Sequence, residues 1–118
     1  MAKKILVVDD DANIVDYLIS VLEDHGYQTC RAPDGIAAYE VAVAEKPDLI
    51  TLDLEMPREG GPRFYQRLTQ LEEFKKIPVI VISGIPGIHL AIQHAVATLK
   101  KPFDPADLIR IVREAVGE

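Results

Sequence analysis

Short apolar runs alternate with longer amphipathic stretches along this chain. Three of the runs are almost free of polar residues, at Ile5–Val8, Leu49–Leu52 and Val79–Ile82. Short runs rich in β-branched residues are typical of strands that are covered on both faces of a sheet. Weaker runs at 28–32 and 97–100 predict two more strands, so we expect five strands in all.

The stretches between these runs carry apolar residues at helical spacing. In the first stretch four apolar residues lie on one face of a helix that ends at Gly26: Ile14, Leu18, Val21 and Leu22. The stretches 36–44 and 64–71 follow the same pattern. The last helix has the clearest start, because Asp104 suits the N-cap and Pro105 the first helical position. Alternating strands and helices predict a doubly wound α/β fold, with helices on both faces of a parallel sheet.

Length and charge narrow the class of protein. With 118 residues we expect a single domain spanning residues 1–118. Lys and Arg number 13 against 19 Asp and Glu, and the net charge of −6 argues against a nucleic-acid-binding surface. The apolar run before Asp9 is too short for a signal peptide or a membrane span, so we expect a cytoplasmic protein. Cys30 is the only cysteine, which excludes an internal disulfide and favours a buried side chain.

Three carboxylates follow the predicted strands. Asp9 and Asp10 come directly after the first run, and Asp53 comes directly after Leu49–Leu52. The carboxyl ends of the strands are where open α/β sheets build their sites, so we expect these side chains to converge. Each pair of like charges costs roughly 4 kcal/mol at 4 Å with an effective dielectric near 20. A set of oxygen ligands without thiolate predicts a hard cation, Mg²⁺ first.

Two further residues end predicted strands at the same edge. Ser83 follows the fourth run and Lys101 follows the fifth. A hydroxyl and an ammonium that face a metal-bound carboxylate would bind a dianionic group with three oxygens, because each partner donates to or neutralises one oxygen. This arrangement predicts a site for a phosphoryl group.

Four motifs in order resemble the receiver domain of two-component response regulators, over essentially the whole chain. They are VVDDD at the first strand, LDLEMP around Asp53, VIVISG ending at Ser83 and Gly84, and KKPF at Lys101. The resemblance implies a flavodoxin-like fold, with a five-stranded parallel sheet of order 2-1-3-4-5 and five helices.

Carried over by position, the resemblance makes Asp53 the phosphoacceptor, Ser83 the switch hydroxyl and Lys101 the lysine that grips the phosphoryl group. The Mg²⁺ ligands that it implies are Asp9, Asp10, Asp53 and the backbone carbonyl of Glu55. The phosphoryl donor would be a histidine kinase or a phosphotransfer protein. Such a domain catalyses its own modification and is not an enzyme with a separate turnover substrate.

The chain departs from the family pattern near its fifth strand. Thr98 stands where the family has an aromatic residue three positions before the lysine. The segment from Ser83 to Lys101 is about four residues shorter than expected, roughly one helical turn. Pro86 and Gly87 also weaken a helix there. We therefore expect the fourth helix to be short or irregular.

Two other functions stay open beside the phosphorylated receiver. Thr98 and the short segment favour an interaction module that works without phosphorylation. A Mg²⁺-dependent phosphatase would need a second carboxylate, for which Glu55 is the only candidate. A nucleotide site is excluded, because the first strand leads into three aspartates where a glycine-rich loop would be needed. The output partner and a homodimer are left open by the sequence.

Overall fold

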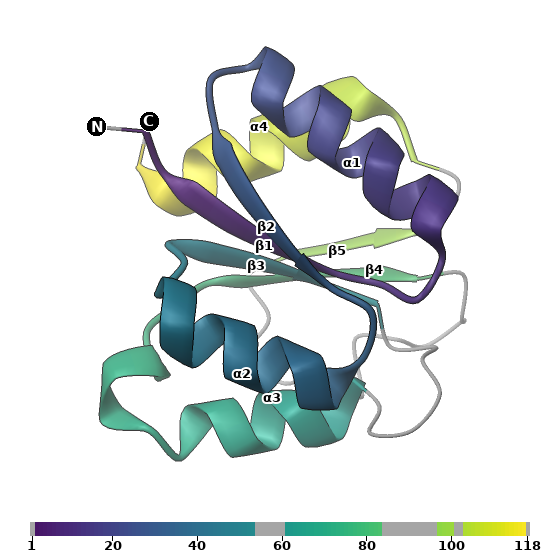
Figure 1. Cartoon of the computed structure of the whole chain (residues 1–118). Coiled ribbons are helices and arrows are strands. Elements are labelled where there is room, and N and C mark those ends of the chain that lie inside the picture. Colours follow the sequence, from purple (N-terminus) through teal and green to yellow (C-terminus); the bar gives the residue numbers. More distant parts are fainter. Residues whose placement is uncertain (1, 54–60, 84–96, 101–102, 118) are drawn as a thin grey trace.

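The computed structural model describes residues 2–53, 61–83, 97–100 and 103–117. Within them one parallel sheet has helices on both faces (Figure 1). Its strands are β1 (Lys4–Val8), β2 (Gln28–Ala32), β3 (Leu49–Leu52), β4 (Val79–Ser83) and β5 (Ala97–Lys100). Their spatial order is β2-β1-β3-β4-β5. The predicted α/β class and the parallel order 2-1-3-4 are confirmed.

The helices follow the strands in the expected alternation. They are α1 (Ala12–Asp24), α2 (Gly35–Glu45), α3 (Gly61–Thr69), the 3₁₀ helix η1 (Glu72–Phe74) and α4 (Pro105–Val116). The helix expected between β4 and β5 falls on residues 84–96, outside the described part of the chain. None of the described helices is long and apolar enough to cross a membrane.

The unbroken apolar strands supply two cores because successive side chains point to opposite faces of the sheet. Ile5 and Val7 of β1 join the core under α1 and α4, whereas Leu6 and Val8 join the core under α2 and α3 (Figure 1). All four side chains are at most 1% exposed. Burial on both sides explains why the polar–apolar alternation of a half-exposed strand is missing from this run.

Helix boundaries follow the sequence signals with one correction. Asp104 caps α4 by accepting a hydrogen bond from the amide of Ala106 at 2.8 Å, and Pro105 is the first helical residue, as predicted. The prediction was wrong for Leu71, which lies two residues beyond the end of α3. Its amide donates to the carbonyl of Leu68, a 3₁₀-type bond that tightens the chain after the helix. The side chain still packs against the α2–α3 core, which accounts for the helical spacing.

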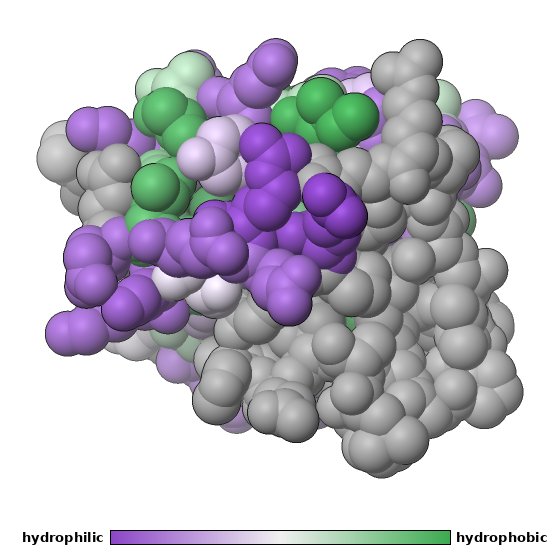
Figure 2. Space-filling view, turned by 90° about the horizontal axis from the view of Figure 1, so that it is seen from below, coloured by the Kyte–Doolittle hydropathy of each residue, from purple (hydrophilic) through white to green (hydrophobic). Residues whose placement is uncertain are grey.

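The surface over α2 and α3 is mixed in character. Figure 2 shows mostly hydrophilic side chains over the described part of this side, with separate hydrophobic areas between them. Ile36 and Val43 of α2 are 45% and 42% exposed. Scattered apolar side chains of this kind are ordinary on a folded protein.

Cys30 is half-buried in β2, and burial raises the pKa of its thiol to about 11, consistent with an inert side chain.

Lys46 at the end of α2 gives a testable stability prediction. It caps the helix in the left-handed conformation, with φ 49°, and its amide donates to the carbonyl of Ala42. This conformation costs an L-residue roughly 1–2 kcal/mol, and glycine does not have that cost. Glycine also gives the unfolded chain more conformational entropy, which lowers stability by about 0.4–1 kcal/mol. Lys46→Gly should therefore raise the free energy of unfolding by about 0.5–1 kcal/mol in urea denaturation.

The matched control is Lys75→Gly. Lys75 follows η1 with φ −57°, where a side chain is not strained. This variant should lose stability, because glycine adds freedom to the unfolded chain and relieves nothing. Equal changes in the two variants would contradict the strain at Lys46.

Candidate functional site

Three carboxylates meet at the carboxyl edge of the sheet. One oxygen from each of Asp9, Asp10 and Asp53 can be chosen so that all three lie within 4.8 Å of one another. Asp9 and Asp53 are each 3% exposed, whereas Asp10 is exposed. We call these residues the acidic cluster. The predicted convergence of the three side chains is therefore found in the fold.

Strand pairing sets the positions of the two buried carboxylates. Val8 of β1 is the partner of Leu52 in β3. The ladder continues one residue further, because the amide of Asp53 donates to the carbonyl of Val8 at 2.9 Å. On the other side of β1, the amide of Asp9 donates to the carbonyl of Ala32 at 3.2 Å. Both residues therefore sit on backbone fixed by the sheet.

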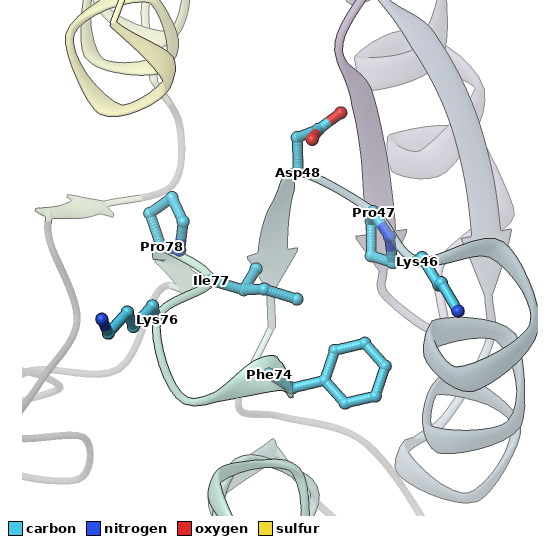
Figure 3. A pocket seen from close by; sticks show the side chains of 7 residues that line it. All are labelled: Lys46, Pro47, Asp48, Phe74, Lys76, Ile77 and Pro78. Atoms are coloured by element: carbon cyan, nitrogen blue, oxygen red, sulfur yellow. The ribbon is translucent and has the colours of Figure 1, made fainter. Parts of the chain in front are cut away.

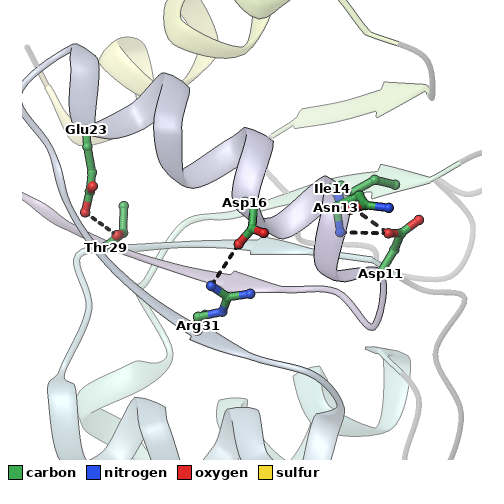
Figure 4. Close-up of polar contacts among 7 residues, drawn as sticks. All are labelled: Asp11, Asn13, Ile14, Asp16, Glu23, Thr29 and Arg31. Carbon is green, nitrogen blue, oxygen red and sulfur yellow. Dashed lines mark hydrogen bonds and ion pairs between the residues drawn. The ribbon is translucent and has the colours of Figure 1, made fainter.

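The third consecutive aspartate, Asp11, has a structural role at the start of α1. Asp11 caps α1, and its carboxylate accepts hydrogen bonds from the amides of Asn13 and Ile14 at 3.0 and 3.4 Å (Figure 4). Its own amide donates to the carboxylate of Asp9 at 2.9 Å. The tight turn after β1 thus orients Asp9 and starts the helix at the same time.

The donor set of the acidic cluster fits a hard divalent cation. It offers carboxylate oxygens and no sulfur, which suits Mg²⁺ and disfavours softer metals. Two of the three carboxylates are buried, so their mutual repulsion is only weakly screened by solvent. A bound cation would relieve that repulsion.

The structure describes the other predicted site residues only in part. Ser83 ends β4 and pairs with Lys100 of β5, but only its backbone belongs to the described part of the chain. Glu55 and Lys101 lie outside the described residues, so their roles stay predictions.

Thr51 is a residue near the site that the sequence did not single out. It lies two residues before Asp53, is 1% exposed, and its hydroxyl has no hydrogen-bond partner among the described residues.

A hollow of about 310 Å³ lies at the opposite edge of the sheet (Figure 3). It is lined by Lys46, Pro47, Asp48, Phe74, Lys76, Ile77 and Pro78. Asp48 and Pro78 directly precede β3 and β4, whereas Asp53 follows β3. Figure 3 shows the side chains of Lys46 and Lys76 extending away from each other, so they do not form one anion site. This hollow is separate from the acidic cluster.

Comparisons with known proteins agree with this geometry. A family model, the response regulator receiver domain, matches residues 5–113. Protein Rrf1 of Nitratidesulfovibrio vulgaris is 37% identical over 117 residues, covering 99% of this chain and 85% of that protein. A putative response regulator from Chloroflexus aurantiacus has a crystal structure similar at TM-score 0.94 and 27% identity, with 100% of both chains covered.

One similar structure contains a metal ion. The receiver domain of the sensor histidine kinase PA1611 from Pseudomonas aeruginosa was solved with a magnesium ion coordinated in its active-site cleft. It is 25% identical to this chain at TM-score 0.91, with 100% of both chains covered. The residues matched by the family model include all three members of the acidic cluster.

The electrostatic cost of the acidic cluster can be measured without any metal. Asp10→Asn removes one charge from an exposed position within 4.8 Å of two others. Because Asp10 is exposed, each of its two pairs is worth about 1 kcal/mol at such distances in water, so the variant should be more stable than wild type by up to about 2 kcal/mol. Urea denaturation in EDTA measures this, and added salt should shrink the difference.

The control is Glu40→Gln, which neutralises an exposed acid on α2 away from the acidic cluster. Its stability should stay within about 0.5 kcal/mol of wild type. An Asp10→Asn protein no more stable than wild type would mean that the three carboxylates do not repel one another as the geometry requires.

Proposed function

The chain belongs to the response regulator receiver domain family, and from this we propose that it accepts a phosphoryl group on Asp53 in a Mg²⁺-dependent reaction. The donor in this proposal is the phosphohistidine of a histidine kinase or of a phosphotransfer protein. The observation that carries the proposal is the convergence of Asp9, Asp10 and Asp53 at the carboxyl edge of the sheet. Receiver domains are signalling modules, and the acidic cluster lies where this family places its chemistry.

The proposed step is an in-line displacement at phosphorus. A carboxylate oxygen of Asp53 attacks the phosphorus atom, an O–P bond forms, and the P–N bond to the donor imidazole breaks, with its electron pair staying on nitrogen. Because the carboxylate is a weak nucleophile, catalysis consists of positioning and charge neutralisation. Asp9, Asp10 and the other carboxylate oxygen of Asp53, with the Glu55 carbonyl, would hold Mg²⁺. A bound ion would supply positive charge for the phosphoryl oxygens.

The strand register supports roles for Ser83 and Lys101. Leu52 pairs with Val81, so Asp53, the residue after β3, is level with Ile82, and Ser83 lies one residue further along β4. Lys100 is level with Ser83, and Lys101 follows it in the chain. Each step along a strand rises by about 3.3 Å, so the backbone of Ser83 lies about that far beyond the level of Asp53. In the proposal the Ser83 hydroxyl donates to one phosphoryl oxygen and the Lys101 ammonium neutralises another.

The proposal treats residues 1–118 as one receiver domain that modifies itself and has no separate turnover substrate. Its cytoplasmic location remains a prediction from the sequence.

The second candidate function is a receiver fold that binds its partner without phosphorylation. The observation that favours it is Thr98, which replaces the family's aromatic residue at a position paired with Val81 of β4.

Mass spectrometry after incubation with acetyl phosphate and Mg²⁺ tests the proposed function. Wild-type protein should gain one phosphoryl group, because Asp53 is the nucleophile at the metal-binding edge. Asp53→Asn should gain none, since the amide nitrogen is not a nucleophile of this kind. Asp24→Asn, at the far end of α1, should react like wild type. EDTA should abolish the gain in wild type and in Asp24→Asn.

Two outcomes would contradict the proposal that Asp53 is the phosphoacceptor. One is a phosphoryl group that persists in Asp53→Asn, which would place the modification elsewhere. The other is an unmodified wild-type protein in excess Mg²⁺, which would favour the interaction module that works without phosphorylation.

A further inference from the structure

Thr51 is the polar residue of an otherwise apolar buried strand. It is 1% exposed and its neighbours in β3 are Leu49, Ile50 and Leu52. Its hydroxyl has no hydrogen-bond partner among the described residues. Buried hydroxyl groups are normally bonded to protein or to ordered water, so this one calls for an explanation.

The sheet register shows what lies around the hydroxyl. Thr51 pairs with Val7 on one side and Ile80 on the other, and both are apolar. The core cluster on this face of the sheet consists of hydrophobic side chains from the strands, α1 and α4. Because side chains alternate along a strand, Asp53 projects on the same face as Thr51, one layer higher. In that layer Asp9 follows Val7 by two residues. The acidic cluster therefore supplies the polar side chains above Thr51.

The spacing suits one intervening water molecule. Two residues along a parallel strand rise by about 6.6 Å, which is too far for a direct hydrogen bond between the side chains. Two hydrogen bonds through one water span roughly 5.6 Å. Such a water would have the Thr51 hydroxyl and two carboxylates as partners, within the usual range of two to four.

We propose that Thr51 is a positioning residue of the acidic cluster: its hydroxyl acts through one buried water on the carboxylates of Asp53 and Asp9 and holds them in their metal-binding orientation. This inference rests on the proposed function, because it concerns the same Mg²⁺ site. Thr51 touches neither the metal nor the phosphoryl group. Removal of such outer partners typically weakens metal affinity by about 10- to 100-fold.

Titration of ¹⁵N-labelled protein with Mg²⁺, followed by amide chemical shifts, tests the inference without any activity assay. Thr51→Val keeps the shape of the side chain and removes the hydroxyl, so its Mg²⁺ dissociation constant should rise about tenfold. Thr51→Ser keeps the hydroxyl and should stay within threefold of wild type. The control is Thr29→Val, because Thr29 is a strand threonine whose hydroxyl donates to Glu23 at 2.8 Å, away from the site (Figure 4). It should leave the dissociation constant unchanged.

Melting in EDTA gives a second measurement. If the hydroxyl is bonded through water, Thr51→Val should melt no higher than wild type, whereas an unbonded hydroxyl would make the valine variant more stable. A change in Mg²⁺ affinity below threefold for Thr51→Val, or an equal loss in Thr51→Ser, would overturn the positioning role. If wild-type protein does not bind Mg²⁺ at all, the proposed metal site itself is wrong.

Discussion

The pairing of β1 with β3 is the contact on which the rest of the site depends. It brings Val8 level with Leu52, and the next residue on each strand is an aspartate. The backbone bond from the Asp53 amide to the Val8 carbonyl extends the ladder into the site. A shift of one residue in this register would turn every side chain of one strand to the other face and separate the two carboxylates. Because both faces of these strands are apolar, the close fit of their side chains in the two cores opposes that shift, and the packed core thereby fixes the geometry of the charged edge.

Three consecutive aspartates have three different environments. Asp9 is buried and accepts a hydrogen bond from the Asp11 amide, Asp10 is exposed, and Asp11 caps α1. The cap places the positive end of the α1 dipole close to the acidic cluster, where it favours negative charge. Part of the repulsion among the carboxylates is thus offset by the same turn that orients Asp9. Local structure and charge balance are coupled in this short segment.

The strands and the cluster were predictable because their signals are local. Apolar runs such as Ile5–Val8 can be stable only when buried, and an acid directly after such a run must lie at the strand's carboxyl end. The adjacency of β1 and β3 is not local, and it came from the resemblance to a family. Two features were not predictable: the left-handed conformation of Lys46, and the buried hydroxyl of Thr51, which has no hydrogen-bond partner among the described residues. Each depends on backbone or packing that only the folded chain defines. The predicted extension of the third helix to Leu71 was wrong, because Leu71 has helical spacing and packs on the core although it lies beyond the end of α3.

A conformational change that follows the proposed phosphorylation of Asp53 would not require an aromatic residue at Thr98. A hydrogen bond to a charged group is worth roughly 1.5–3 kcal/mol, and that difference shifts a two-state equilibrium by about 10- to 150-fold. A phosphoryl group on Asp53 that gains the Ser83 hydroxyl as a donor would therefore bias the chain after β4 by itself. The aromatic residue of other receivers would add apolar area that changes exposure on switching. Without it, the response of this chain should depend on polar contacts at the acidic edge, and less on repacking around β5.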